Sequence, residues 1–236
     1  MKGLILAGGT GSRLAPLTDA TNKHLLAVGK KPMIYYPIEK LVNADIKDIM
    51  IVTGTEHMGE IVKTLGSGIK FHCDFTYRVQ DTAGGIAEAL GLARGFCYGD
   101  RVCVILGDNI FEDGLQYYLY QYMRQDKGAM VLLKDVPDPK RYGVAEVKEE
   151  KIISIEEKPE EPKSTLAVTG IYMYDYKVFD IVDKLKPSGR GELEITDVNN
   201  QYLEWGELNY MILKGYWTDA GEHNSLARAN ALVAGS

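Results

Sequence analysis

A glycine-rich turn at residues 8–13, GGTGSR, follows directly after the short apolar run Leu4–Ala7. Glycines let the backbone pass close to a ligand and present its N–H groups to phosphate oxygens. Arg13 adds a planar set of donors that suits phosphate, and Lys23 places a second cation ten residues later. These residues predict a phosphate-binding loop, against the simpler interpretation of a tight turn with surface charges.

The kind of phosphate loop is narrowed by residue type. A loop of the G-x-x-x-x-G-K-[ST] kind would need glycine at position 13, where this chain has arginine, and no G-K-[ST] follows. The dinucleotide pattern G-x-G-x-x-G matches Gly9 and Gly11 but meets Leu14 in place of its third glycine. The two commonest phosphate loops are therefore excluded, which disfavours a flavin or nicotinamide oxidoreductase.

Two carboxylates have contexts that suit a metal ion. Asp108 ends the apolar run in ILGDN, and carboxylates at the ends of parallel strands face the ligand crevice of an α/β sheet. Mg²⁺ prefers one or two carboxylates together with substrate phosphates. Taken alone, Asp108 is equally a turn residue. Asp219 in WTDAGE, taken alone, is more simply the N-cap of a helix that begins near Gly221.

Composition limits the class of protein. The 236 residues are 45% hydrophobic, enough for one domain with a real core, and the net charge of −6 disfavours nucleic-acid binding. We expect no signal peptide and no membrane helix, because no apolar run approaches the roughly 20 residues that a span needs. Three cysteines, Cys73, Cys97 and Cys103, form no CxxC pair, so we expect buried thiols and a cytoplasmic protein.

Alternating strand and helix patterns must position these residues. The alternation is typical of βαβ units, so we predict an α/β fold with a mostly parallel, Rossmann-like sheet flanked by helices. Strands are expected at Leu4–Ala7, Ile49–Val52, Phe71–Tyr77, Val102–Leu106 and Ala129–Leu133, and helices at Ile34–Val42, Met58–Leu65, Ile86–Ala93 and Leu115–Met123.

The pattern changes after Lys134. We expect a single domain over residues 1–236, with a nucleotide-binding core over about 1–134 and a smaller, sugar-sized substrate half over about 135–236. The elements expected in this second half are a β-hairpin (Tyr142–Val147 and Lys151–Glu156), a longer strand (Leu166–Tyr174), a helix with Ile195, Val198 and Tyr202 on one face, and a last helix from near Gly221.

Several motifs occur together in one order over nearly the whole chain, and the chain resembles the sugar nucleotidylyltransferases. They are LAGGTGSRLAPLT, K-x-LL-x-V, KPMIYYP, RVQ with GGIAEA, LGDN, YGV, EEKP, VTGIY, GRGELEITDVN and WTDAGE. Two segments depart from the family: Ala27 stands where proline is usual, and DTAGG replaces a proline-containing stretch near the expected base site.

The resemblance implies attack by the phosphate of a sugar 1-phosphate on the α-phosphorus of a nucleoside triphosphate, with loss of pyrophosphate. It is strongest to the branch that uses dTTP and glucose 1-phosphate, and it implies Mg²⁺ and a homo-oligomer. The nucleophile is already an anion, so positioning and charge neutralisation carry the catalysis. A uridylyltransferase or another sugar phosphate remains an alternative, as does a non-catalytic nucleotide-sugar-binding regulator, which the intact charged residues disfavour.

The resemblance also implies roles for particular residues. Gln80 suits the edge of a pyrimidine because an amide both donates and accepts hydrogen bonds, whereas Glu192 and Glu194 can equally pair with Arg190 and are left outside the site. The implied catalytic residues are Arg13, Lys23 and Lys158, and the implied metal ligands are Asp108 and Asp219. The implied nucleotide-binding residues are Leu6, Ala7, Gly8, Gly9, Gly11, Gln80, Gly85 and Asp108, and the implied sugar-phosphate-binding residues are Asn109, Gly143, Glu157, Lys158, Val168, Gly170 and Tyr172.

Long members of the resembled family carry further helices after the WxDxG segment, and those helices help to build an effector site. The printed sequence stops at Ser236, soon after the corresponding segment. Allostery needs a second site with different affinities for two states. We therefore expect an end product such as dTDP-rhamnose to compete at the active site, with little cooperativity.

Overall fold

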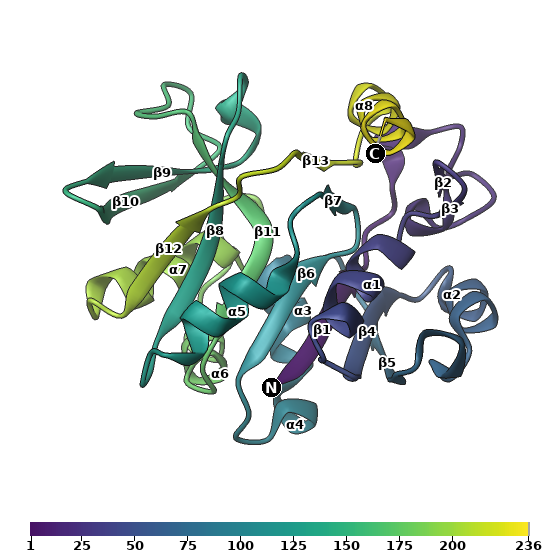
Figure 1. Cartoon of the computed structure of the whole chain (residues 1–236), viewed down its shortest axis with the longest axis horizontal. Helices are drawn as coiled ribbons and strands as arrows, with labels where there is room; N and C mark the ends of the chain where they lie inside the picture. Colours follow the sequence, from purple (N-terminus) through teal and green to yellow (C-terminus); the bar gives the residue numbers. More distant parts are fainter. Residues whose placement is uncertain (236) are drawn as a thin grey trace.

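One nine-stranded sheet forms the centre of the computed structural model, which describes residues 1–235 (Figure 1). The strand order is β10-β9-β11-β6-β1-β4-β5, while β8 pairs with β11 and β12 pairs with β8. The strands are β1 (Lys2–Ala7), β4 (Asp48–Gly54), β5 (Asp74–Gln80), β6 (Val102–Leu106), β8 (Ala129–Asp135), β9 (Gly143–Lys148), β10 (Lys151–Glu157), β11 (Leu166–Tyr174) and β12 (Leu208–Ile212).

Strand β1 is the middle of the parallel part of this sheet. It pairs in parallel with β4 and with β6, and β4 pairs in parallel with β5. Strand β11 runs antiparallel to both β6 and β8, and so joins the parallel core to the strands of the second half. The predicted α/β fold with a parallel core is confirmed, and a single sheet continues through both halves of the chain.

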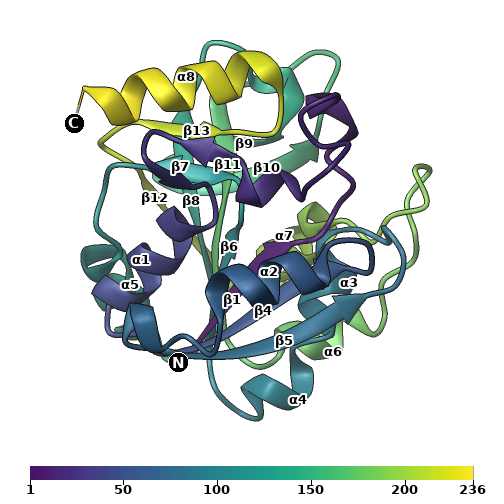
Figure 2. The same ribbon diagram turned by 90° about the vertical axis from the view of Figure 1, so that its right-hand side faces the viewer.

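Helices cover both faces of the sheet, because the side chains of a buried strand alternate between the faces. Ile5 packs with the cluster formed by α1 (Tyr35–Asn43), α2 (Met58–Leu65) and α5 (Leu115–Met123). Leu4 packs with the cluster formed by α3 (Ile86–Gly91), α6 (Val178–Val182) and α7 (Ile195–Glu204). Figure 2 shows these layers, with the short helix α4 (Arg94–Cys97) below them.

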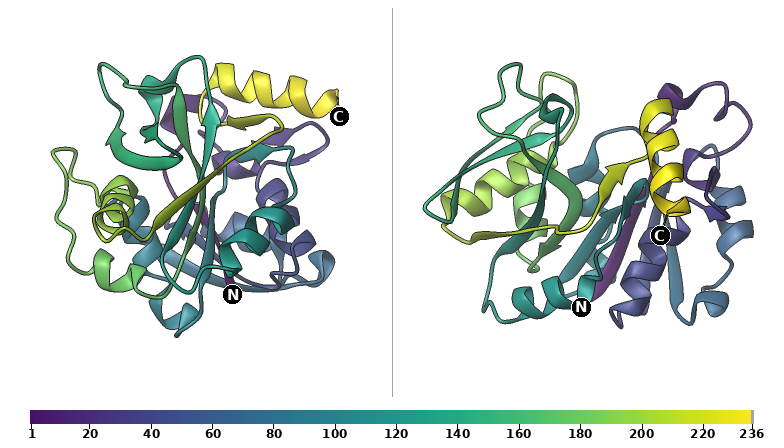
Figure 3. Two further views of the ribbon diagram at one scale, coloured as in Figure 1. Left: turned by 60° about the vertical axis from the view of Figure 1, so that its left-hand side comes forward. Right: turned by 45° about the horizontal axis from the view of Figure 1, so that its top comes forward.

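Two small sheets and the last helix lie beyond the carboxyl ends of the parallel strands. Strand β2 (Ala27–Val28) pairs with β3 (Lys31–Pro32), and β7 (Asn109–Phe111) pairs with β13 (Trp217–Asp219). Helix α8 (His223–Ala234) packs over them around a separate apolar cluster of Val28, Met33, Ile110, Ala220 and Ala229 (Figure 3). The end of the described chain therefore contacts the N-terminal segment beside the glycine-rich turn.

Most predicted elements are confirmed, and those at 58–65, 102–106, 115–123 and 166–174 match to the residue. The predicted start of the strand Phe71–Tyr77 is wrong, because Ile69–Phe71 forms a 3-10 turn and His72 has φ 58°, so β5 begins at Asp74. The predicted helix Ile86–Ala93 ends early, at Gly91, a poor helix former. Strands β2, β3, β7, β12 and β13 and helices α4 and α6 were not predicted.

No helix within residues 1–235 combines the length and the apolar character that crossing a membrane requires. The three cysteines are all buried and unpaired, as predicted. Burial raises the pKa of the Cys97 thiol to about 12 and that of Cys103 to about 12, so both behave as apolar core groups.

Truncating the centre of the sheet should destabilise the whole domain. Ile5 is fully buried, so Ile5→Ala should lower the free energy of unfolding by about 2–5 kcal/mol through lost burial and a residual cavity. Urea denaturation followed by circular dichroism measures this change. Ile69→Ala is the matched control: the Ile69 side chain is 79% exposed, and a change beyond about 0.5 kcal/mol there would contradict the burial argument.

Candidate active site

The turn after β1 is shaped by its glycines. Gly9 has φ 91° and Gly11 has φ 66°, in the left-handed region that favours glycine. A Cβ on Gly11 would also lie 2.9 Å from Thr18 Cγ2, and Thr18 Oγ1 donates a hydrogen bond of 2.9 Å to the Gly11 carbonyl. The chain then forms a 3-10 turn at Ser12–Leu14, which carries Arg13 to the open end of the sheet.

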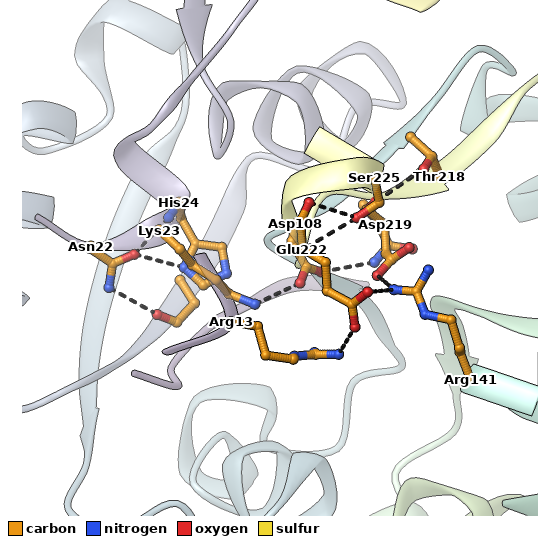
Figure 4. Close-up of polar contacts among 12 residues, drawn as sticks. Arg13, Asn22, Lys23, His24, Asp108, Arg141, Thr218, Asp219, Glu222 and Ser225 are labelled. Atoms are coloured by element: carbon orange, nitrogen blue, oxygen red, sulfur yellow. Dashed lines mark hydrogen bonds and ion pairs between the residues drawn. The ribbon is translucent and has the colours of Figure 1, made fainter. Parts of the chain in front are cut away.

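A part-buried ion pair joins this N-terminal segment to the end of β6. Lys23 Nζ lies 2.6 Å from Asp108 Oδ2, and the two side chains are only 14% and 13% exposed (Figure 4). Burial opposes ionisation of Asp108, but the charge of Lys23 and hydrogen bonds from Lys23 and Asn109 outweigh it and hold the Asp108 pKa well below its usual range. Asp108 is therefore a carboxylate with a cation of the chain already beside it.

His24 supports the position of Lys23 without carrying charge. Burial, followed by the nearby Lys23 charge, lowers the pKa of His24 to about 3, so the ring is neutral. Asn22 Oδ1 lies 2.8 Å from both the backbone nitrogen and Nδ1 of His24. An amide oxygen only accepts hydrogen bonds, so the ring proton sits on Nδ1. His24 fixes the turn that presents Lys23.

The second predicted metal carboxylate comes close to the first. Strand β13 pairs with β7 so that Asp219 lies opposite Asn109, and the Ala220 N–H donates to the Asp108 carbonyl at 2.8 Å. A Cβ on Gly221 would lie 3.4 Å from Asp108 Oδ2 and 3.4 Å from Asp219 Oδ2. Glycine thus leaves a space between two carboxylate oxygens, a donor set that fits Mg²⁺. Residues 1–235 contain no group of three or more His, Cys, Asp or Glu placed to hold a metal ion.

Asp219 is also held by neighbours from the second half of the chain. Tyr142 donates its hydroxyl to Asp219 Oδ1 at 2.8 Å, and Arg141 Nη2 lies 3.2 Å from Asp219 Oδ2. The Tyr142 ring makes an edge contact with the Trp217 indole, with centroids 5.2 Å apart. Asp219 is therefore oriented by two side chains that precede β9.

The buried side chain of Asn109, on β7, makes hydrogen bonds to residues of β11 and β13. Its Nδ2 donates to Asp108 Oδ1 at 3.1 Å, and its Oδ1 accepts the Gly170 N–H at 3.1 Å and the Trp217 indole N–H at 2.7 Å. The Asn109 side chain lies beside the position that a Cβ on Gly170 would occupy. Asn109 thus orients the Asp108 carboxylate and explains the need for glycine at position 170.

Gln80 presents only one of its amide atoms to the site. Its Nε2 donates to the Gly85 carbonyl at 3.2 Å and to Glu88 Oε2 at 2.5 Å, and both partners are pure acceptors. The amide orientation is therefore fixed, and Oε1 faces Gly8, where a Cβ would stand 3.0 Å away. From the sequence, the Gln80 amide was expected both to donate and to accept hydrogen bonds. In the structure its NH₂ group donates to acceptors of the protein itself, and only the oxygen is left to accept.

Two cavities meet at Asp108. The first, on the glycine-loop side, is lined by Leu6, Gly8, Gly9, Arg13, Lys23, His24, Gln80, Ala83, Gly85, Ile86, Ala89, Leu106, Asp108 and Glu192. The second is lined by Arg13, Ile86, Leu106, Asp108, Asn109, Arg141, Tyr142, Gly143, Glu157, Lys158, Val168, Gly170, Tyr172, Arg190, Glu192, Glu194, Ile195, Thr196, Trp217 and Asp219. The two lists bring together every predicted site residue except Ala7, which is buried, and Gly11, which shapes the turn.

One group of charged residues in the second cavity lies at the end of β10 and on the loop before α7. Glu157 Oε2 accepts the Thr196 hydroxyl at 2.6 Å, and Lys158 follows with φ 46°, an uncommon backbone conformation for a residue other than glycine. Arg190 pairs with Glu194 at 2.7 Å and approaches Glu157 at 3.5 Å. The sequence left open whether Glu192 and Glu194 pair with Arg190 or line the site. Both pair with Arg190, Glu192 at 3.5 Å and Glu194 at 2.7 Å, and both also line this cavity.

Sequence reasoning missed several residues that the fold brings into this region. Arg141 directly precedes the YGV motif, and Glu222 ends the WTDAGE motif, so each lay beside a recognised signal. Their partners are far away in the chain, and no local pattern marks such pairs. Arg141 contacts Asp219 and Glu222, and Glu222 in turn contacts Arg13.

The chain has close relatives among known proteins. It is 46% identical to the glucose-1-phosphate thymidylyltransferase of Neisseria meningitidis over 99% of this chain and 82% of the relative, and 47% identical to that of Xanthomonas campestris pv. campestris over 97% and 79%. It is 62% identical to a proposed glucose-1-phosphate thymidylyltransferase from Bacillus anthracis, crystallised with sucrose, with a TM-score of 0.96 over 98% of this chain and 94% of that one.

A crystal structure of UDP-glucose pyrophosphorylase with UDP-glucose also shares the fold, at 25% identity and a TM-score of 0.86 over 99% of this chain and 98% of that one. Residues 2–236 match the family described as "Nucleotidyl transferase". Together with the relatives and the two joined cavities, this match shows that the chain belongs to the nucleotidyl transferase family.

Proposed function

We propose that this protein transfers a thymidylyl group from dTTP to glucose 1-phosphate and releases dTDP-glucose and pyrophosphate. The observation that carries the proposal is the meeting of two cavities at Asp108, with Arg13 on the wall of both. A transfer between two phosphorylated substrates needs adjoining sites and shared cations at the reacting phosphates. The names of the relatives support this pair of substrates.

The residues supply position and charge rather than a general base. The nucleophile is the phosphate of glucose 1-phosphate, which is already ionised, and it would be held by Lys158 while Glu157 accepts sugar hydroxyls. Arg13 and Lys23 would hold the triphosphate through charge-assisted hydrogen bonds. Mg²⁺ would be held by Asp108 and Asp219, and bound there it would neutralise charge on the phosphates. In-line attack on the α-phosphorus then expels pyrophosphate.

The base would lie against Gln80 and the backbone near Gly85. Gln80 Oε1 accepts hydrogen bonds and faces Gly8, so it suits the N3–H of thymine or uracil. Cytosine carries an acceptor at that position and would meet the oxygen unfavourably. Because thymine and uracil share this edge, transfer of a uridylyl group is the second candidate function, which the likeness to a UDP-glucose pyrophosphorylase also favours.

The proposal extends to the cell compartment and to assembly. Buried, unpaired cysteines suit a reducing compartment, so we place the protein in the cytoplasm. The homo-oligomer and the competitive action of dTDP-rhamnose remain predictions from the resemblance.

Product formation with different triphosphates tests the proposed function. With glucose 1-phosphate and Mg²⁺, pyrophosphate release should be fastest with dTTP, with kcat/KM exceeding that for UTP by only about 10- to 200-fold, the scale of one methyl contact. CTP, ATP and GTP should give rates near background. A preference for a purine triphosphate would contradict the base site, and release that does not depend on glucose 1-phosphate would contradict the transfer reaction.

The metal assignment predicts a strong effect at Asp108. Asp108→Asn should lower kcat by about 100-fold or more, because it removes one preorganised charge contact at the reacting phosphates. Activity of the unchanged protein should vanish with EDTA and return with Mg²⁺. Asp126→Asn, on an exposed turn, is the control and should keep full activity. A folded Asp108→Asn variant with normal turnover would show that Asp108 holds no essential metal.

Arg13 and Lys158 should affect different substrates. Arg13→Ala should mainly raise KM for dTTP and Lys158→Ala mainly KM for glucose 1-phosphate, each by about tenfold or more, the scale of one hydrogen bond to a charged group. Both can also lower kcat, since charge in the transition state is shared. Steady-state kinetics with each substrate varied separately measures the difference, with the exposed Arg124→Ala as control. Identical profiles for the two variants would contradict this division.

A further inference from the structure

The carboxylate of Glu222 lies between two arginines that come from opposite sides of the active site (Figure 4). Arg13 Nη1 lies 2.5 Å from Glu222 Oε1, and Arg141 Nη2 lies 3.1 Å from Glu222 Oε2. Arg13 is the last residue of the glycine-rich turn, whereas Arg141 precedes β9 in the second half of the chain. Glu222 thus connects the two sides through ion pairs, and the one with Arg13 is also a hydrogen bond.

Glu222 is the fixed member of this group. It is the N-cap of α8 and forms a capping box with Ser225. In this box the side chain of each residue accepts a hydrogen bond from the backbone N–H of the other. The positive end of the helix also favours a carboxylate there. Next to it, His223 Nε2 lies 2.9 Å from the Ala15 carbonyl, so the start of α8 is tied to the loop by a second contact.

Arg13 is the movable member. Its side chain is 65% exposed, against 33% for Glu222, so packing does little to hold the guanidinium. Its Nη2 lies 3.5 Å from the point where a Cβ on Gly221 would stand, beside the Asp108 and Asp219 carboxylates. The Arg13 charge therefore lies against carboxylates of the chain itself.

Glu222 has no place in the predicted metal site. No group of three acidic or imidazole side chains within residues 1–235 is placed to hold a metal, so Glu222 does not complete the Asp108–Asp219 pair. Besides capping α8, the Glu222 carboxylate has two charged partners, and both are arginines. Guanidinium groups bind carboxylates and phosphates with the same donors, so the two anions compete for one arginine.

We propose that Glu222 is a positioning residue, an internal counter-ion of Arg13 that the triphosphate must displace. This proposal rests on the proposed function, since it names dTTP as the competing anion. Glu222 keeps Arg13 extended near the junction of the two cavities and sets the affinity for the triphosphate below what Arg13 alone would give. Glu222 acts only through Arg13 and does not touch the substrate.

The proposal is tested by the direction of an affinity change. Glu222→Gln keeps the size and a capping acceptor but removes the charge, so the dissociation constant for dTTP with Mg²⁺ should fall by about two- to fivefold, the scale of one exposed ion pair. Calorimetric titration without glucose 1-phosphate measures it. Damage to the fold would weaken binding instead, and Ser225→Ala, which disrupts the capping box and leaves both arginine contacts, should not tighten it.

A double-mutant cycle separates exchange at Arg13 from general repulsion. In an Arg13→Ala background, Glu222→Gln should leave dTTP affinity unchanged, because the competing partner is gone. Equal tightening in both backgrounds would overturn the proposal, and so would weaker or unchanged binding in the Glu222→Gln single variant. Unchanged protein that binds no dTTP would overturn the proposed function itself and the counter-ion role with it.

Discussion

A carboxylate placed at the end of a buried strand needs a compensating cation, and this requirement organises the N-terminal quarter of the chain. Asp108 follows β6, whose residues are among the most buried in the protein. An unpaired charge there would cost several kcal/mol. Lys23 supplies the cation from a 3-10 turn that Asn22 and neutral His24 hold in place. A Cβ on Gly11 would lie 3.1 Å from Lys23 Cβ, so glycine at position 11 also leaves room for this cation.

The same principle extends across the whole site. Asp108 pairs with Lys23, Asp219 with Arg141, and Glu222 with both Arg13 and Arg141. Groups that the resemblance assigns to a metal ion or to phosphates are thus each paired with an opposite charge of the chain. On the proposed function, substrate binding would therefore exchange ionic partners within the site rather than fill a site of unpaired charges.

The sequence allowed much of this to be predicted, and the failures have physical causes. Long apolar runs and helical periods located most elements, because burial leaves a periodic pattern. Strands β7 and β13 are three residues each, too short to show a period, yet their pairing brings Asp219 opposite Asn109. The contact of Arg13 with Glu222 spans 209 residues and depends on where α8 packs, so residue types alone could not reveal it.

Gln80 shows how an amide gains specificity from its surroundings. In the sequence it is a side chain that both donates and accepts, which would tolerate several bases. In the fold, Gly85 and Glu88 take both of its donor hydrogens, and neither can give one back. Rotating the amide would set oxygen against oxygen, so Oε1 stays toward Gly8, where glycine leaves room for it. The residues behind Gln80, and Glu88 above all, thus fix which amide atom faces the site. Gln80 presents an acceptor, which suits a base with an N–H at that edge.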